Sequence, residues 1–307
     1  MAAESSCSPL KNRFEPEVLT LLCSLELKAR YVVESFLSGL HGSPFHGTST
    51  DFSEYRQYHP GDELRQLDWR VYARSDRLCI KRFTAETNAH FYVICDTSGS
   101  MGYRGQRAWG SKLECSCVMA AAMSWLMLRQ NDAVGLLSLS EDDATTERFG
   151  SSRTTSQYTL MVRQLEQLRA AGGARLPALL SLAVRLVRRR SIIVLFSDLL
   201  EPSETVKDCF SELRFLGHDC MVFQVLDHDE LEFPFDNTAI FEDLETGARR
   251  RVSPRAARQK YLRRFESFMS RRREIFERLE IPHCVVRTDE DPWQVLARFL
   301  QERGRLI

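Results

Sequence analysis

The sequence has no excess of charge of either sign, because 42 Lys and Arg residues balance 42 Asp and Glu residues. No global field therefore draws nucleic acid or an anionic membrane to the chain, and such a role would need a local patch. The sequence also lacks an apolar run near the roughly 18 residues that a membrane span needs. Residues 1–8 contain no basic segment followed by an apolar one. We therefore expect a soluble, cytoplasmic protein without membrane contact.

Paired cysteine motifs are missing as well. Nine cysteines are present, an odd number, and no Cys-x-x-Cys pair has a second pair to match it. Most of these cysteines lie within apolar strand or helix patterns, which is typical of buried, reduced thiols. The chain also shows no phosphate-binding loop, no nucleophile–base pair and no Cys/His metal set. These absences argue against several classes of enzyme.

The length and composition suit a sizeable folded core. The chain has 307 residues, of which 43% are hydrophobic and 27% are charged, so it is neither disordered nor fibrous. Apolar strand-like runs alternate with helical periodicities, which predicts an α/β fold with a doubly wound, mostly parallel sheet. We divide the chain into a disordered tail (1–14), an N-terminal helical and irregular extension (15–88) and an α/β domain (89–307) with a β-hairpin insertion at 227–253.

The stretch FYVICDTSGSM, residues 91–101, carries the first candidate site. Its apolar run ends abruptly in Asp96, Ser98 and Ser100, which predicts a buried strand that opens into a loop of oxygen ligands. A later apolar run, SIIVLFSDLL, ends in Asp198 and its two following leucines. Ligands in doubly wound sheets bind beyond the carboxyl ends of strands at a topological switch. We therefore expect Asp96 and Asp198 to face each other there.

The Asp-x-Ser-x-Ser spacing resembles the metal-ion-dependent adhesion site of von Willebrand factor type A domains. One carboxylate and two hydroxyls are hard oxygen ligands, which Mg²⁺ prefers when a partner's carboxylate completes its octahedron. In such domains a loop threonine and a second aspartate complete the set. The resemblance therefore implies a Mg²⁺ site formed by Asp96, Ser98, Ser100 and Asp198.

The loop that should supply the threonine departs from this pattern. Two glycines are followed by Ala174 and Arg175, and alanine has no ligand atom. The site therefore resembles a weakened or metal-free variant, and Mg²⁺ binding stays open. In one alternative Arg175 takes the place of the cation by pairing with Asp96 or Asp198. In another, both aspartates cap helices or accept loop amides without any metal.

Residues 41–90 interleave arginines, acids and aromatic residues. Arginine pairs bidentately with carboxylates and stacks on aromatic rings. Such a lattice either fixes an irregular region onto the sheet domain or forms a docking surface, because Arg with Tyr and Trp is the composition of interface hot spots. Our candidate partner-binding residues are Arg65, Asp68, Trp69, Arg74 and, beside the first site, Arg175.

The same region carries a signature, Tyr-x-Pro-Gly-Asp-x-x-Arg-x-x-Asp-Trp, over residues 58–69. Together with the loop at 96–100 it resembles the family of domain-of-unknown-function number fifty-eight. Further similar motifs lie at 197–200, 217–219, 225–230 and 243–247, so the resemblance spans residues 38–303. It implies a von Willebrand A-like fold with this signature in front and an association with MoxR-type AAA+ ATPases. The family pattern includes no established catalytic set.

Two late segments allow other interpretations. The acidic stretch 227–230 can be read as a metal cluster, but a capped turn is the more typical structure for it. Residues 249–278 are rich in arginine and could contact phosphates of a nucleic acid. Interspersed glutamates and the lack of a stacking platform favour a solvated helix face instead.

These patterns predict a non-enzymatic binding module that links a MoxR-type AAA+ ATPase to an unknown client protein. One alternative is a Mg²⁺-dependent phosphoester hydrolase that uses Asp96 and Asp198, because metal ions neutralise charge in phosphoryl transfer. The absence of a nearby lysine and of further metal-binding carboxylates argues against this hydrolase. Nucleic-acid binding through 249–278 is the third alternative, and we do not expect it.

Overall fold

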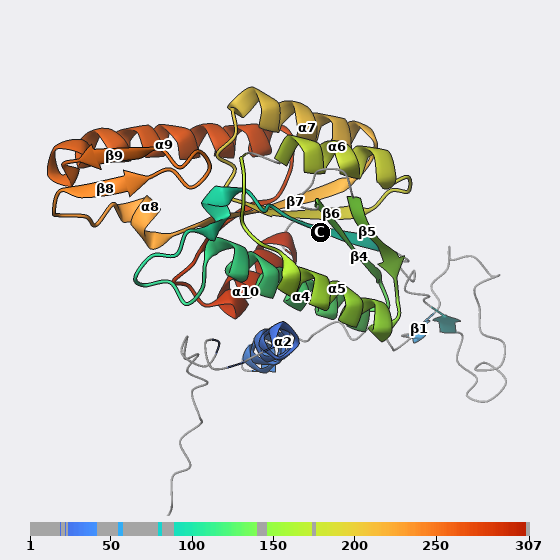
Figure 1. Cartoon of the computed structure of the whole chain (residues 1–307). Coiled ribbons are helices and arrows are strands. Elements are labelled where there is room, and N and C mark those ends of the chain that lie inside the picture. Colours follow the sequence, from blue (N-terminus) through green and yellow to red (C-terminus); the bar gives the residue numbers. More distant parts are fainter. Residues whose placement is uncertain are drawn as a thin grey trace, which may run out of the picture.

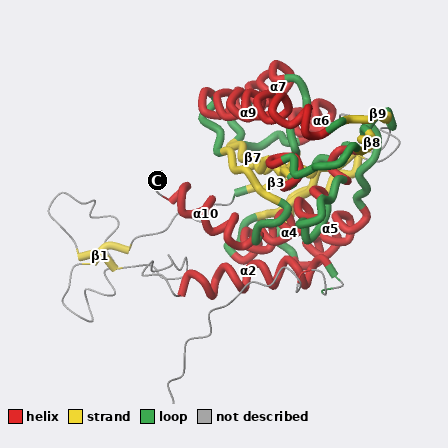
Figure 2. The backbone as a smooth tube through the Cα atoms, turned by 90° about the vertical axis from the view of Figure 1, so that its left-hand side faces the viewer, coloured by secondary structure: helices red, strands yellow, loops and turns green. Residues whose placement is uncertain are grey.

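A six-stranded sheet, covered by helices on both faces, forms the centre of the protein (Figures 1 and 2). The computed structural model describes residues 19, 22, 24–41, 55–57, 79–81, 89–139, 146–173 and 176–304. The sheet strands are β3 (His90–Cys95), β4 (Ala133–Leu139), β5 (Thr146–Ser152), β6 (Ile192–Ser197), β7 (Asp219–Leu226) and β10 (His283–Arg287).

The strand order in this sheet is β10-β7-β6-β3-β4-β5. Every neighbouring pair is parallel except β4 and β5, which are antiparallel. The chain runs from β3 outward to β4 and β5, and then returns to the other side of β3 with β6. The order therefore reverses between β3 and β6, which is the topological switch of a doubly wound sheet. The predicted fold class is confirmed.

The two helical layers explain the continuous apolar strands. The layer on one face contains α2 (Leu25–His41), α4 (Lys112–Arg129), α5 (Thr155–Gln167) and α10 (Pro292–Gly304). The layer on the other face contains α6 (Leu176–Leu186), α7 (Ser203–Phe215) and α9 (Pro254–Arg278). Along β3, Phe91 and Val93 join the first core whereas Tyr92 and Ile94 join the second. Strands buried on both faces need apolar side chains at every position.

None of the helices in the described part of the chain combines the length and the apolar composition that crossing a membrane requires.

Short elements connect or extend the sheet. They are the 3-10 turn η2 (Gly99–Gly102), helix α8 (His228–Glu232) and the antiparallel pair β1 (Tyr55–Gln57) and β2 (Cys79–Lys81). Strands β8 (Ala239–Glu242) and β9 (Arg249–Val252) form a second antiparallel pair beside α9 (Figure 1). This pair is the β-hairpin expected within residues 227–253.

The turn of the β8–β9 hairpin is locally determined. The Asp243 carboxylate accepts hydrogen bonds from the amides of Glu245 (2.9 Å) and Thr246 (3.1 Å), which is the usual behaviour of aspartate at a turn. Gly247 then adopts a positive φ of 69°, which glycine tolerates best. Aromatic packing connects the hairpin to α9, because Phe241 of β8 stacks on Phe233 (centroids 5.8 Å apart) and Phe233 stacks on Tyr261 of α9 (4.6 Å).

Helix α9 is not a solvated basic helix along its whole length, because Arg272 is buried. Its guanidinium donates to the Leu199 carbonyl through Nε (3.0 Å) and Nη2 (2.8 Å), and it also contacts the Glu201 carbonyl. Leu199 has a positive φ of 58°, an uncommon conformation for leucine that needs support from its surroundings. The expectation of a solvated face is therefore wrong at Arg272, which instead fixes the loop that follows β6.

Candidate functional site

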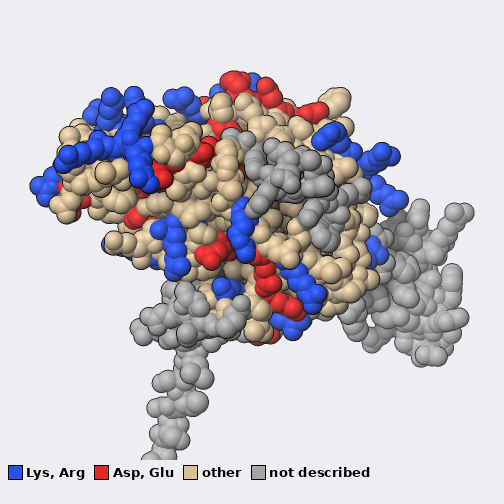
Figure 3. All heavy atoms as spheres, in the orientation of Figure 1, with Lys and Arg blue, Asp and Glu red and all other residues tan. Residues whose placement is uncertain are grey.

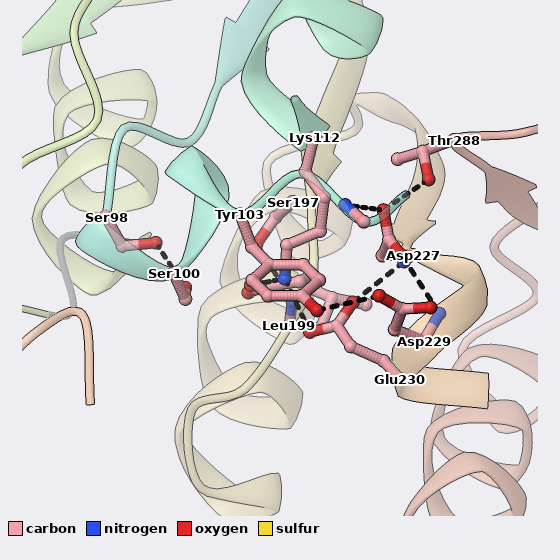
Figure 4. Close-up of polar contacts among 12 residues, drawn as sticks. Ser98, Ser100, Tyr103, Lys112, Ser197, Leu199, Asp227, Asp229, Glu230 and Thr288 are labelled. Atoms are coloured by element: carbon pink, nitrogen blue, oxygen red, sulfur yellow. Dashed lines mark hydrogen bonds and ion pairs between the residues drawn. The ribbon is translucent and has the colours of Figure 1, made fainter. Parts of the chain in front are cut away.

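Asp96 lies directly after β3, beside the end of β6. Its Oδ1 accepts the amide hydrogen of Ser98 (2.9 Å), and its Oδ2 accepts the hydroxyl hydrogen of Ser197 (2.6 Å). The hydroxyls of Ser98 and Ser100 are 3.1 Å apart (Figure 4). Burial raises the pKa of Asp96, although the bonds from Ser197 and Ser98 oppose this shift. Both carboxylate oxygens therefore accept hydrogen bonds from the protein, and Asp96 accepts a loop amide as in the metal-free alternative.

Asp198, at the end of β6, forms a buried ion pair with a lysine. The Nζ atom of Lys112 lies 2.7 Å from Asp198 Oδ2 and 2.7 Å from Glu230 Oε1, and the lysine side chain is 0% exposed. Burial disfavours the ammonium, but the two carboxylates outweigh it and raise the pKa of Lys112. Burial also raises the pKa of Glu230, although the Lys112 ammonium opposes this shift. Lys112 thus remains a cation inside the protein.

Lys112 is the residue that sequence reasoning missed, and the expectation of no nearby lysine is wrong. It is the first residue of α4, after the N-cap Ser111, which forms a capping box with Glu114. A cation at the positive end of a helix dipole is unfavourable unless a carboxylate accompanies it. This placement was the available signal, and Figure 4 shows the Lys112 side chain directed from α4 toward Glu230.

The acidic stretch 227–230 is a capped turn, as the more typical interpretation held. Asp227 is the N-cap of α8, and its amide donates to Glu230 Oε2 (2.8 Å). Asp227 Oδ2 accepts from the Thr288 hydroxyl (2.7 Å) and the Gly105 amide (3.0 Å). The turn fixes Glu230, whose other oxygen pairs with Lys112, so a structural cap also positions a site residue.

The β8–β9 turn lies directly on the site loop. A Cβ atom at Gly99 would collide with the carbonyl oxygen of Leu244 and would lie 3.0 Å from that of Gly172, so only glycine fits. The neighbouring Glu245 and Ser100 both line the cavity beside this loop. Burial raises the pKa of Glu245, and the negative charge of Asp198 adds to this shift. The sequence did not indicate that Glu245 belongs to the site.

The donor set fits a divalent cation poorly. Asp96 already accepts two hydrogen bonds, and the ammonium of Lys112 neutralises Asp198. In the described part of the chain, no group of three or more His, Cys, Asp or Glu residues is arranged to hold a metal ion. Ala174 and Arg175 lie outside the described residues, so pairing by Arg175 stays a prediction.

Three of the four predicted ligands are inaccessible. Asp96, Ser98 and Asp198 are 0%, 2% and 1% exposed, whereas Ser100 is partly exposed. Of the four predicted ligands, Ser100 is therefore the one that a partner protein could contact. The candidate partner-binding residues Arg65, Asp68, Trp69 and Arg74 lie outside the described residues.

The same burial weakens the hydrolase alternative. A pair of aspartates that holds a catalytic Mg²⁺ must be reached by the metal and the substrate, but Asp96 and Asp198 are buried and hydrogen-bonded. Lys112 is the right residue type to bind a phosphate, yet two carboxylates of the same chain already occupy its ammonium. The arrangement is that of a neutralised structural cluster.

Removal of the buried ammonium should be costly. We expect Lys112→Met to lower the free energy of unfolding by about 3–5 kcal/mol, because Asp198 and Glu230 would remain buried without a cation. Urea denaturation measures this, with the exposed Lys207→Met as the matched control. A second substitution, Asp198→Asn, should restore part of the loss. Equal midpoints for Lys112→Met and the control would contradict the assignment.

Glu201 should make stability fall with rising pH. Burial and then the charge of Asp96 raise its pKa from 4.5 to about 7. One of its carboxylate oxygens has no hydrogen-bond partner among the described residues. The stability contributed by the protonated form is complete below pH 4.5 and is lost as pH rises through about 7.

We therefore expect Glu201→Gln to remove a decline of about 3 kcal/mol across this pH range. Unfolding free energies measured at a series of pH values test this, with the exposed Glu204→Gln as control. A decline that persists unchanged in Glu201→Gln would assign the pH dependence to other groups.

Comparison with solved structures shows distant similarities. An aerotolerance-related membrane protein from Bacteroides fragilis, with multiple mutations to serines, is 19% identical, with a TM-score of 0.46; the match covers 71% of this chain and 99% of that one. The VWA domain of SpRpn10 is 9% identical, with a TM-score of 0.39; the match covers 68% of this chain and 93% of that one.

Sequence comparison identifies the family. The uncharacterized protein Rv1480 of Mycobacterium tuberculosis is 25% identical over 296 residues, which are 95% of this chain and 91% of that protein. The model of the family described as "Protein of unknown function DUF58" matches residues 54–273. This match covers more than half of the chain and includes both the signature at 58–69 and the Asp96 loop. The chain is therefore a member of the DUF58 family, as its motifs predicted.

Proposed function

We propose that the protein is a non-enzymatic protein-binding module in which Lys112 replaces the cation of an adhesion-type site. The observation that carries this proposal is the buried Lys112 ammonium, which lies 2.7 Å from both Asp198 and Glu230. With its charges satisfied internally, the site is a rigid platform at the sheet edge. Protein binding is compatible with such a platform, whereas Mg²⁺-dependent phosphoester hydrolysis needs carboxylates that a metal and a substrate can reach.

The shape of the site supports the same conclusion. The Asp96 loop, the β8–β9 turn and α8 meet at the switch point of the sheet, where doubly wound folds bind their ligands. Ser100 is the partly exposed member of the predicted ligand set. It lies at the entrance of a cavity beside the β8–β9 hairpin. A partner would therefore contact Ser100 and the residues around it.

We further propose that the partner is a MoxR-type AAA+ ATPase, for which the module presents a client protein. Membership of the DUF58 family supports this partner, because the resemblance to that family implies an association with MoxR-type ATPases. The proposal predicts an interaction that depends on the nucleotide state of the ATPase and does not require free Mg²⁺ at Asp96.

Capture of the ATPase on the immobilised full-length protein tests the proposal. We expect retention of a MoxR-type ATPase from the same organism in the presence of a non-hydrolysable ATP analogue. A Ser100→Trp variant should retain about tenfold less ATPase, equivalent to about 1.4 kcal/mol of binding free energy, because the indole blocks the entrance. The matched control is Ser156→Trp, at an exposed position on α5.

Two results would count against this function. One is a failure to capture the ATPase in any nucleotide state. The other is equal capture by the wild-type protein and the Ser100→Trp variant, which would place the interface away from the sheet edge.

A further inference from the structure

A groove opens beside the site, between the β8–β9 hairpin, α8 and α9. The groove has a volume of about 610 Å³, and Ser100 and Glu245 are among the residues that line it. The groove is therefore continuous with the site described above.

The interior of this groove is aromatic. Phe233 stacks on Phe241 (centroids 5.8 Å apart) and on Tyr261 (4.6 Å), while Phe235 meets Phe241 edge-on (5.2 Å). Because these rings pack against one another, the groove has a preformed wall. A preformed apolar wall lowers the entropic cost of binding another apolar group.

Large apolar side chains are exposed along the groove edges. Leu200, Ile240 and Leu244 all line the groove and are 48%, 69% and 49% exposed. Clustered exposed apolar residues with a polar rim mark interaction surfaces more often than scattered ones do. The groove therefore has the surface to bind an apolar side chain of a partner.

The charged residues that line the groove are all acidic. Its lining includes the acidic residues Asp229, Glu230, Glu242, Asp243 and Glu245, and no Lys or Arg is part of the lining. Two of these acids have basic partners within the chain, because Glu230 pairs with Lys112 and Glu242 pairs with Arg249 (2.9 Å). The basic side chains gather instead over the end of α9 and the hairpin (Figure 3).

Glu245 differs from those paired acids. It lines the groove beside Ser100 and Asp243, and burial together with the negative charges of Asp198, Asp243 and Asp96 raises its pKa. Among the described residues, no Lys or Arg forms an ion pair with Glu245. A cation brought by a partner would relieve this accumulation of negative charge, whereas a carboxylate would be repelled.

We propose that this groove binds a segment of a partner protein in which one or two apolar side chains stand next to a lysine or arginine. The apolar side chains pack on the aromatic wall of the groove, and the basic side chain pairs with Glu245. This inference rests on the proposed function and names the chemistry of the partner. The charge of the recognised group is opposite to that at a metal-dependent adhesion site, where the partner supplies a carboxylate.

Selection of displayed random heptapeptides on the full-length protein tests this chemistry. We expect enrichment of peptides that combine Leu, Phe or Trp with an adjacent Lys or Arg. The Kd of the best synthetic peptide should rise at least about tenfold in Glu245→Lys, the range for loss of a bond to a charged group. Ile240→Ser should weaken binding through lost apolar contact, while Glu266→Lys, at an exposed position on α9, should have no effect.

Three results would overturn the inference: no enrichment, enrichment of acidic peptides, or peptide binding that Glu245→Lys leaves unchanged. Sedimentation velocity on the protein alone tests whether a second copy of the chain occupies the groove instead. A dimer that Glu245→Lys abolishes would show this and would also overturn the inference. The groove inference and the proposed function fail separately. If peptides are not enriched and the Glu245→Lys variant still captures the ATPase, the groove inference alone is rejected. If the wild-type protein captures no ATPase, the proposed function is rejected.

Discussion

The buried ammonium of Lys112 is the interaction on which the sheet edge depends. It connects the start of α4 to the end of β6 through Asp198 and to α8 through Glu230. A charge at this depth is tolerated only because oppositely charged partners lie in contact with it, and removal of Lys112 would leave two buried carboxylates without a cation. Lys112 therefore fixes the relative positions of three segments that are far apart in the sequence.

The rest of the site is arranged around this fixed point. Asp96 needs no cation to satisfy its hydrogen bonds, because Ser98 and Ser197 each donate one to its carboxylate. Arg272 fixes the loop after Asp198 through the Leu199 carbonyl, and the absence of a side chain at Gly99 allows the β8–β9 turn to lie on the loop. A site held this firmly can recognise a partner by shape and charge with little rearrangement. Its exposed part is Ser100 together with the groove that follows it.

The sequence predicted the parts of this arrangement that depend on local patterns. Apolar runs that end in Asp96 and Asp198 were enough to place both residues at neighbouring strand ends, because parallel strands in a doubly wound sheet share one carboxyl edge. The acids at 227–230 were identifiable as a cap for the same local reason.

Contacts between distant segments could not be predicted in this way. Lys112 and Asp198 are 86 positions apart, and nothing periodic connects them. Arg272 sits in a basic helical pattern that is typical of a solvated face, yet it binds a loop 73 positions away. Glu245 lies beside the site because Phe241 of the hairpin packs on Phe233 and the β8–β9 turn lies on the loop at Gly99.

Calorimetric titration of the purified protein with Mg²⁺ and Mn²⁺ tests most directly the claim that a lysine replaces the cation. The matched control is Asp96→Asn, which removes the charge and keeps the shape of the side chain. The account predicts no saturable binding to either protein, because Lys112 already neutralises Asp198 and the carboxylate of Asp96 is engaged. Saturable binding to the wild-type protein that is lost in Asp96→Asn would contradict it.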